Sequence, residues 1–341
     1  MNNTKKNKDL KSELTGINPS KTSIDPSFEI LHRKKTIKGT LSSYMDRFDI
    51  FSEPIQNSLD AIDLKRKKED KKKKSSYQPK LWIRIDLTKN LVTVTDNGIG
   101  MSLEELKEFA KPGVSLNKAI GLTRGNKGVG VTYLTFGFSY LKVQTKYEKE
   151  TLEASYSISN GRNWIEDEKG TSFGEPESSH EDYNCEKLDS ETSGTEITIK
   201  TGGNEREVPR SLSWLRVTKA EDWYTCLLFK TPLGIIDKSG QGIEVNIDVI
   251  STGKTDTCQK SDPEFIFPWD FPGLGKVEDI DDIAAAEAKE RKKGPGDVVA
   301  RMNKKWKNLD AMYAIWDENK ILKKDGDFIK SKIFDEASFL M

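Results

Sequence analysis

The sequence predicts a mixed α/β protein, and three observations support this fold class. Residues 81–87 (LWIRIDL) and 91–96 (LVTVTD) alternate in side-chain character with the period of a half-buried strand. Residues 44–63 carry apolar side chains at helical spacing. Residues 113–130 are punctuated by glycine and lead into an apolar run. The length of 341 residues suggests two domains, or one domain with appendages.

The composition excludes several classes of protein. There is no apolar run of the ~20 residues that a membrane span needs, so we expect a soluble, cytoplasmic protein with no membrane partner. Three cysteines without C-x-x-C spacing and two histidines argue against a disulfide scaffold and a zinc site. The 55 basic residues balance 55 acidic residues, so DNA binding would have to depend on a local patch.

The chain divides into four predicted regions. Residues 1–27 are polar and predict a disordered arm. Residues 28–204 hold most of the patterned segments, interrupted by a basic insert at 65–80. Its lysine-rich part, KRKKEDKKKK, is read as a solvated helix end and loop, with a phosphate-binding patch as the alternative. Residues 205–275, with a helix near 222–230 and a strand at 243–250, predict the start of a second α/β domain.

The last region, residues 276–341, is predicted to be helical. Its apolar residues are spaced by 3, 4, 3, 4 and 3 positions, which is a heptad-like stripe. They are Val299, Met302, Trp306, Leu309, Tyr313 and Trp316. Because the stripe covers fewer than three heptads, a helix packed on its own domain is favoured over a coiled coil.

The helix predicted at 44–63 has two different faces. Glu53, Asn57 and Asp60 fall within about 60° of one another at 100° per residue. The opposite face is apolar and is formed by Ile55, Leu59 and Ile62. The simplest interpretation is an amphipathic surface helix; the alternative is a site that presents a carboxylate, an amide and a second carboxylate in a row.

Two further segments combine glycine with groups that bind ligands. Asp96 ends a predicted strand just before Gly98 and Gly100, and a buried carboxylate there needs a partner such as a ligand amine. A D-N-G hairpin turn is the alternative. The segment RGNKGVGV, at 124–131, exposes backbone N–H groups of the kind that bind phosphate, although it matches neither a Walker A nor a dinucleotide-binding motif.

In this order and spacing, the motifs EPIQNSLDA, DNGIGM, GNKGVG and SGTEI resemble those of the GHKL ATPase superfamily. That superfamily includes DNA gyrase B subunits, ninety-kilodalton heat-shock chaperones, MutL proteins and MORC ATPases. The resemblance covers roughly residues 40–202. It implies the Bergerat fold, a two-layer α/β sandwich whose mixed sheet carries helices on one face.

The resemblance also implies roles for individual residues. Glu53 would be the catalytic general base, Asn57 would ligate Mg²⁺, and Asp60 would support the adenine end of the pocket. Asp96 would accept a hydrogen bond from the adenine amino group, and Thr195 would reach the water network beside it. The remaining nucleotide-binding positions would line the pocket or form the phosphate lid: Gly98, Gly100, Met101, Gly125, Lys127, Gly128, Val129 and Gly130.

The implied activity is slow, Mg²⁺-dependent hydrolysis of ATP that drives homodimerisation through the lid and the N-terminal arm. The alternative is a non-catalytic, nucleotide-gated protein-interaction module. A protein partner or DNA is a further expectation, with the MORC-like proteins of bacterial genome defence and antiviral defence as precedent. His32 lacks the neighbours of a phosphoacceptor histidine, which argues against a kinase. Lys230 is a candidate γ-phosphate contact, and a surface lysine is the alternative.

Overall fold

The computed structural model describes residues 26–69, 76–112, 129–168, 172–235 and 242–261, together with short strands at 298–302, 311–315, 323–324 and 327–328. The predicted N-terminal arm lies outside these residues, except for Pro26 and Ser27, which begin helix α2 (Pro26–Leu41). In the basic insert, residues 70–75 also lie outside them.

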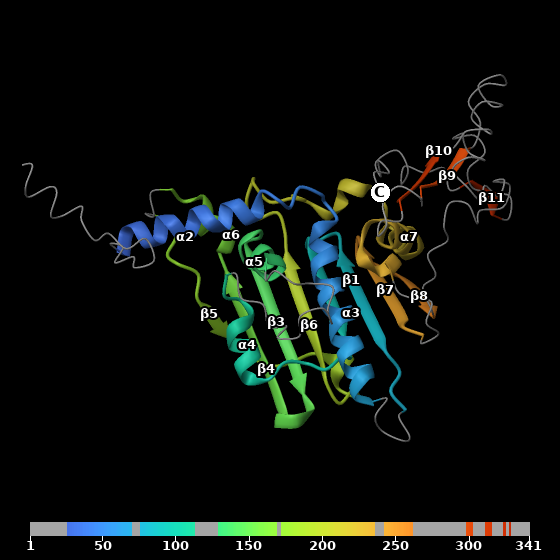
Figure 1. Ribbon diagram of the computed structural model, residues 1–341, viewed down its shortest axis with the longest axis horizontal. Helices are drawn as coiled ribbons and strands as arrows, with labels where there is room; N and C mark the ends of the chain where they lie inside the picture. The colour runs from blue at the N-terminus through green and yellow to red at the C-terminus, as the bar shows by residue number, and fades with distance from the viewer. Residues whose placement is uncertain are drawn as a thin grey trace, which may run out of the picture.

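An eight-stranded sheet forms the centre of the molecule, in the order β5-β4-β3-β6-β2-β1-β7-β8 (Figure 1). Its strands are β1 (Lys80–Asp86), β2 (Leu91–Asp96), β3 (Tyr140–Tyr147), β4 (Leu152–Ser159), β5 (Ser178–His180), β6 (Gly194–Lys200), β7 (Glu244–Ser251) and β8 (Lys254–Ser261). Neighbouring strands run antiparallel except β1 and β7, which run parallel. The predicted mixed sheet is therefore confirmed.

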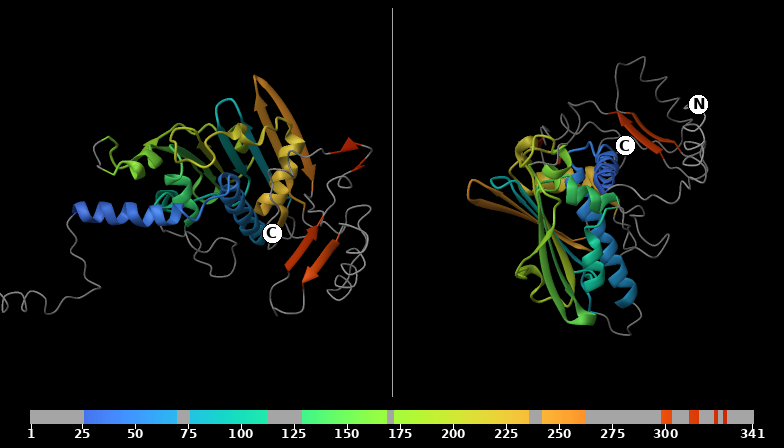
Figure 2. Two further views of the ribbon diagram at one scale, coloured as in Figure 1. Left: turned by 90° about the horizontal axis from the view of Figure 1, so that it is seen from above. Right: turned by 90° about the vertical axis from the view of Figure 1, so that its left-hand side faces the viewer.

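The helices cover one face of this sheet, as Figure 2 shows, so the predicted two-layer α/β architecture is confirmed. They are α3 (Asp49–Glu69), α4 (Leu103–Phe109), α5 (Val129–Phe136), α6 (Gly161–Glu166) and α7 (Ala220–Lys230). Four single 3-10 turns accompany them: η1 (Glu148–Glu150), η2 (Glu186–Leu188), η3 (Leu212–Leu215) and η4 (Pro232–Ile235). Among the described helices, none is long and apolar enough to cross a lipid bilayer.

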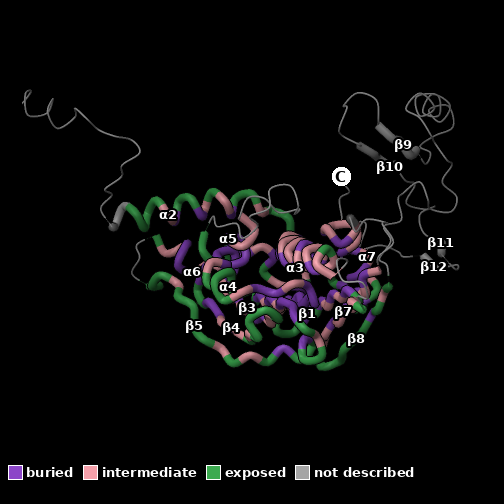
Figure 3. The backbone as a smooth tube through the Cα atoms, turned by 60° about the horizontal axis from the view of Figure 1, so that its bottom comes forward, coloured by how far each residue is buried: buried purple, intermediate pink, exposed green. Residues whose placement is uncertain are grey.

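The hydrophobic core lies between α3 and the sheet. The predicted apolar face of α3 is buried, since Ile55, Leu59 and Ile62 are at most 1% exposed. The rings of Phe51 on α3 and Trp223 on α7 lie 5.4 Å apart and join the two helices. Figure 3 shows buried residues concentrated in the middle of the sheet, and exposed residues along α2 and edge strand β8.

The hairpin predicted at 81–96 is present. Strands β1 and β2 pair from Leu81 with Asp96 to Asp86 with Leu91. The turn at 87–90 ends with Asn90 at φ 53°, a left-handed conformation that asparagine adopts more readily than most residues. In β2, Val92, Val94 and Asp96 share one face because side chains alternate along a strand.

Residues beyond 204 continue the same sheet. Strand β7 pairs in parallel with β1, and β8 pairs with β7 at the edge. Helix α7 contacts both of these strands. The predicted domain boundary at residue 204 stays a prediction, and strands on both sides of it share one sheet.

Two sequence-based expectations are wrong where the structure describes the residues. In the predicted C-terminal helical segment, β9 (Val298–Met302) pairs with β10 (Ala311–Ile315), and β11 (Lys323–Lys324) pairs with β12 (Asp327–Phe328). Valine, isoleucine and tyrosine favour strands, and a short apolar stripe does not distinguish helix from strand. Lys65, the first residue of the basic run, is buried rather than solvated, because it faces the core side of α3.

Candidate functional site

Asp96 lies where helix α3, strand β6 and the loop after β2 meet. Its side chain is 2% exposed, and one carboxylate oxygen accepts a hydrogen bond of 2.8 Å from the Gly98 N–H. The Ser58 hydroxyl on α3 and the Thr195 N–H on β6 also donate to this carboxylate. Three separate elements therefore hold one buried acid, and sequence reasoning identified Asp96, Gly98 and Thr195 but not Ser58.

Burial raises the pKa of Asp96 to about 7, because desolvation disfavours the charged carboxylate. The hydrogen bonds from Gly98, Ser58 and Thr195 and the nearby Lys65 ammonium act in the opposite direction. A ligand that donates a hydrogen bond to this carboxylate would stabilise its charged form further. The position therefore suits an acceptor for a ligand amine.

The glycine loop after β2 lies tightly against its neighbours. A Cβ on Gly98 would lie 2.6 Å from the carbonyl carbon of Ala61 on α3, and the Ile99 N–H donates to the Ala61 carbonyl at 3.1 Å. Gly100 has φ +71°, and a Cβ there would collide with the carbonyl oxygen of Lys146. The chain then enters helix α4 and not a return strand, so the alternative of a simple D-N-G hairpin is wrong.

A row of polar side chains crosses the sheet beside Asp96. Asp96 pairs with Thr195, and Thr195 pairs with Thr145 on β3. The Met101 N–H donates to the Thr145 hydroxyl at 2.9 Å, and the Ser193 hydroxyl donates to the Gly98 carbonyl at 2.7 Å. Sequence reasoning missed Thr145 and Ser193. The signal for Thr145 is that its strand continues an apolar face that ends on a polar residue.

Glu53 belongs to the first turns of α3, and its side chain lies against the start of α5. The Tyr44 hydroxyl donates to a Glu53 carboxylate oxygen at 2.9 Å, and the Tyr44 ring stacks on Tyr133 of α5 with centroids 4.1 Å apart. A Cβ on Gly130 would collide with the Glu53 carboxylate. Burial raises the pKa of Glu53 and the hydrogen bond from Tyr44 lowers it.

Asn57 and Asp60 occupy the next turns of the same helix. The Asn57 side-chain nitrogen is buried and has no hydrogen-bond partner, which ordinarily costs about 1–3 kcal/mol. Asp60 is buried. From Glu53 to Ser58, which contacts Asp96, the helix rises about 7.5 Å. A single helix thus carries Glu53, the orphaned amide of Asn57 and a direct contact to Asp96.

Part of the predicted phosphate lid lies outside the described residues, namely Gly125, Lys127 and Gly128. Val129 and Gly130 are described and begin α5. Lys230 ends α7, and its carbonyl oxygen accepts a hydrogen bond of 3.4 Å from Ser52, the residue before Glu53. The end of α7 is therefore beside this part of α3, while the direction of the Lys230 ammonium toward a phosphate stays a prediction.

Comparison with curated proteins finds relatives among bacterial chaperones. The chain is 28% identical over 177 residues to the chaperone protein HtpG of Buchnera aphidicola subsp. Cinara cedri, covering 49% of this chain and 27% of the relative. It is 31% identical over 173 residues to HtpG of Buchnera aphidicola subsp. Baizongia pistaciae, covering 46% and 25%. For HtpG of Coxiella burnetii strain RSA 331, it is 28% identical over 205 residues, covering 56% and 30%.

The chain thus spans between a quarter and a third of the length of these relatives. No protein-family profile matches it. HtpG chaperones are members of the GHKL ATPase superfamily, so the resemblance seen in the four sequence motifs is confirmed over about half of the chain.

Proposed function

We propose that the region from residue 28 to residue 204 is a GHKL-type domain that binds ATP and hydrolyses it slowly with Mg²⁺. The observation that carries this proposal is the buried carboxylate of Asp96 at the end of β2, held by α3, β6 and a glycine loop. Helix α3, which contributes to this contact, also carries Glu53 and Asn57. The similarity to HtpG chaperones supports the same class of activity.

In this proposal the adenine base binds at the Asp96 end of α3. The Asp96 carboxylate accepts a hydrogen bond from the exocyclic amino group, and Gly98 and Gly100 let the backbone approach the flat ring closely. Met101 and Thr195 flank this position, since the Met101 N–H and the Thr195 N–H are fixed by Thr145 and Asp96. Asp60 supports the same end of the pocket.

The triphosphate extends toward Glu53 and the start of α5, where the lid residues 125–130 join the helix. Asn57 is the proposed Mg²⁺ ligand through its side-chain oxygen, because Mg²⁺ prefers oxygen ligands and Asn57 lies one helical turn beyond Glu53 on α3. Its buried side-chain nitrogen, which has no hydrogen-bond partner in the protein, can donate to a ligand oxygen. The described residues contain no group of three His, Cys, Asp or Glu side chains that could hold a metal ion. An ion bound at Asn57 would therefore take its other ligands from phosphate oxygens and water, and it would offset phosphate charge.

Glu53 is the proposed general base. Its pKa is raised by burial, and a base whose pKa lies closer to neutrality accepts a proton from water more effectively near pH 7. The Tyr44 hydroxyl fixes one carboxylate oxygen, and the other lies against Gly130 at the start of α5. Lys127 in the lid and Lys230 at the end of α7 are the proposed sources of positive charge for the γ-phosphate.

ATP binding is proposed to switch the domain between two states, with lid closure and homodimerisation as the response. A glycine-rich lid loses much backbone entropy when it is fixed, so it orders around bound phosphate. A role with DNA or in genome defence would depend on the basic residues after Lys65, because Lys65 itself is buried.

The hydrolytic proposal is tested by Glu53→Ala. The variant should bind ATP with unchanged affinity, because Glu53 faces the water and not the base or ribose. Its turnover should fall by about a hundredfold or more, which is the usual loss when a general base is removed. Calorimetry and a phosphate-release assay on the same preparations measure both quantities.

The alternative function is a nucleotide-gated interaction module that does not depend on hydrolysis. It predicts ATP binding with a phosphate-release rate that is the same in the wild type and in Glu53→Ala. That outcome would replace the enzymatic assignment while leaving the nucleotide site in place.

A further inference from the structure

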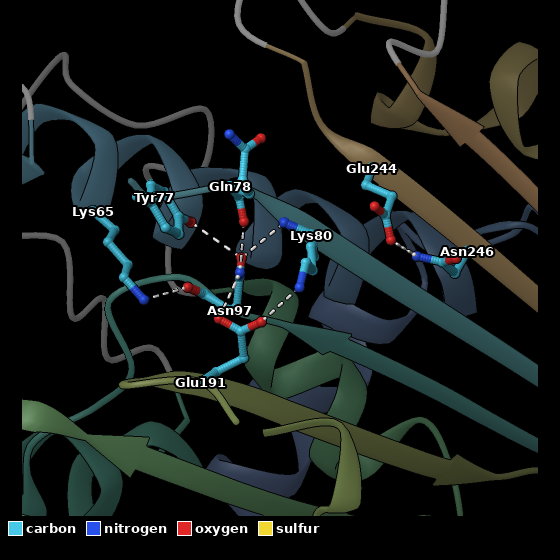
Figure 4. Close-up of polar contacts among 8 residues, drawn as sticks. All are labelled: Lys65, Tyr77, Gln78, Lys80, Asn97, Glu191, Glu244 and Asn246. Atoms are coloured by element: carbon cyan, nitrogen blue, oxygen red, sulfur yellow. Dashed lines mark hydrogen bonds and ion pairs between the residues drawn. The ribbon is translucent and has the colours of Figure 1, made fainter. Parts of the chain in front are cut away.

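In the residue after Asp96, the buried side chain of Asn97 is the centre of a polar network (Figure 4). Its amide nitrogen donates to the Gln78 carbonyl at 2.8 Å and to a Glu191 carboxylate oxygen at 3.1 Å. Its amide oxygen accepts from the Lys80 N–H at 2.8 Å and from the Tyr77 hydroxyl at 3.2 Å. The residue that follows Asp96 is therefore fixed from several directions.

Lys65 enters this network from α3. Its side chain is buried, which is rare for lysine unless the ammonium is paired. The ammonium donates to the Asn97 carbonyl oxygen at 2.8 Å and lies 4.6 Å from the centre of the Tyr77 ring. Lys65 is two helical turns beyond Ser58, which donates to Asp96, so both face the same side of α3.

The charges around this position are few and can be named. Lys65 on α3 and the Tyr77 hydroxyl in the segment before β1 interact electrostatically with Asp96. Lys65 itself interacts with Glu191 and Asp96, and also with Glu148 and Glu69. Burial lowers the pKa of Lys65 and these carboxylates raise it, whereas Lys65 lowers the pKa of Asp96. The ammonium is the cation that opposes the desolvation of Asp96.

We propose that Lys65 is a positioning residue that favours the charged form of Asp96 and thereby strengthens the preference of the site for purines with an exocyclic amino group. This inference rests on the proposed function, since it assumes that Asp96 faces the purine. A charged carboxylate only accepts hydrogen bonds, so it matches the 6-amino group of adenine and opposes the 6-oxo group of hypoxanthine. A neutral carboxyl group can donate, and it would accept the 6-oxo group.

The test compares the affinities for ATP and for inosine triphosphate in the wild type and in Lys65→Met, from pH 6 to pH 8. The two ligands share one triphosphate, so its titration cancels in their affinity ratio. A rise of about one unit in the pKa of Asp96 would reduce the preference for ATP about tenfold at pH 6 and less than about twofold at pH 8. Loss of packing alone would weaken both ligands equally at every pH.

Lys67→Met is the matched control, because Lys67 is an exposed lysine on the same helix and its replacement should leave the ratio unchanged. Lys65→Gln is a second neutral variant that can still donate to the Asn97 carbonyl, and it keeps the test valid if Lys65→Met does not fold. A wild-type ratio in a folded neutral variant overturns the inference, as does an equal loss for both ligands. A wild-type protein that binds neither ligand would instead overturn the proposed function.

Discussion

At the scale of single residues, the contact between Tyr44 and Glu53 decides how the proposed base behaves. The hydroxyl donates to the carboxylate and so stabilises its charged form, while burial opposes that form. Because the Tyr44 ring is stacked on Tyr133, the hydroxyl is held in place by α5. Helix α5, which begins with the proposed lid residues Val129 and Gly130, therefore also helps to orient the proposed base.

Tyr44→Phe should move the acidic limb of the pH–rate profile for ATP hydrolysis to higher pH. Removing the donor raises the pKa of Glu53, and only the unprotonated carboxylate can accept a proton from water. The loss of rate should thus grow as the pH falls and disappear as the pH rises. Turnover measured across this range at saturating ATP gives the shift.

Tyr133→Phe is the control for that experiment. It removes a hydroxyl from the same stacked pair of rings, but this hydroxyl donates to the Val208 carbonyl and not to Glu53. Its pH profile should match the wild type. Identical profiles for Tyr44→Phe and the wild type would argue that Tyr44 does not influence the base.

At this scale, helical and strand periodicity in the sequence predicted several residues of the candidate site. The spacing of Glu53, Asn57 and Asp60 predicted one polar face on α3, and strand alternation predicted that a half-buried strand ends at Asp96. Thr145 and Tyr44 were not predicted, because their partners are brought together by tertiary packing and local patterns carry no information about it. The burial of Lys65, which lies in a lysine-rich run, could not be predicted for the same reason.

At the scale of elements, helices α3 and α5 approach each other closely at Gly130. The Gly130 backbone lies so close to Glu53 that a Cβ would collide with the carboxylate. The colliding atoms are at the end of a flexible side chain, so a methyl group would displace the carboxylate more readily than it would separate the helices.

Gly130→Ala should therefore fold with a stability close to that of the wild type and lose most of its turnover, by about tenfold to a hundredfold. Thermal unfolding and phosphate release measured on one preparation test this combination. Gly39→Ala is the control, because no atom lies within 4 Å of a Cβ at that helical position, and it should change neither quantity by much. A variant of Gly130 with full turnover would show that the position of the carboxylate is not critical.

Whether a strand pairing could be predicted depended on how far apart the two strands lie in the sequence. The hairpin of β1 and β2 follows from adjacent alternating segments and a short turn. The parallel partner of β1 is β7, which begins at Glu244, and no local pattern marks such a pairing. In the C-terminal region, heptad-like spacing competed with the strand preference of the residues at 298–302 and 311–315, and the strands formed.

At the scale of the whole molecule, the described sheet joins residues 80–200, which carry the strands of the candidate site, to residues 244–261. The central claim is that this sheet and α3 hold Asp96 buried for a purine amine. A buried carboxylate of this kind reduces stability at neutral pH, since its pKa is about 7 in the folded protein against about 3.9 when unfolded. Its stabilising contribution is present below about pH 4 and is lost as the pH rises through about 7.

Asp96→Asn removes that titration, so the stability of the variant relative to the wild type should increase between pH 4 and pH 7. This change in thermal unfolding provides the control that the variant is folded. Calorimetric titration with ATP at pH 7.5 is then the most direct test, with Glu53→Ala beside it. We predict that Asp96→Asn loses about a hundredfold or more in ATP affinity while Glu53→Ala binds as the wild type does. Equal ATP affinity in the wild type and a folded Asp96→Asn variant would contradict the assignment of Asp96 to the purine site.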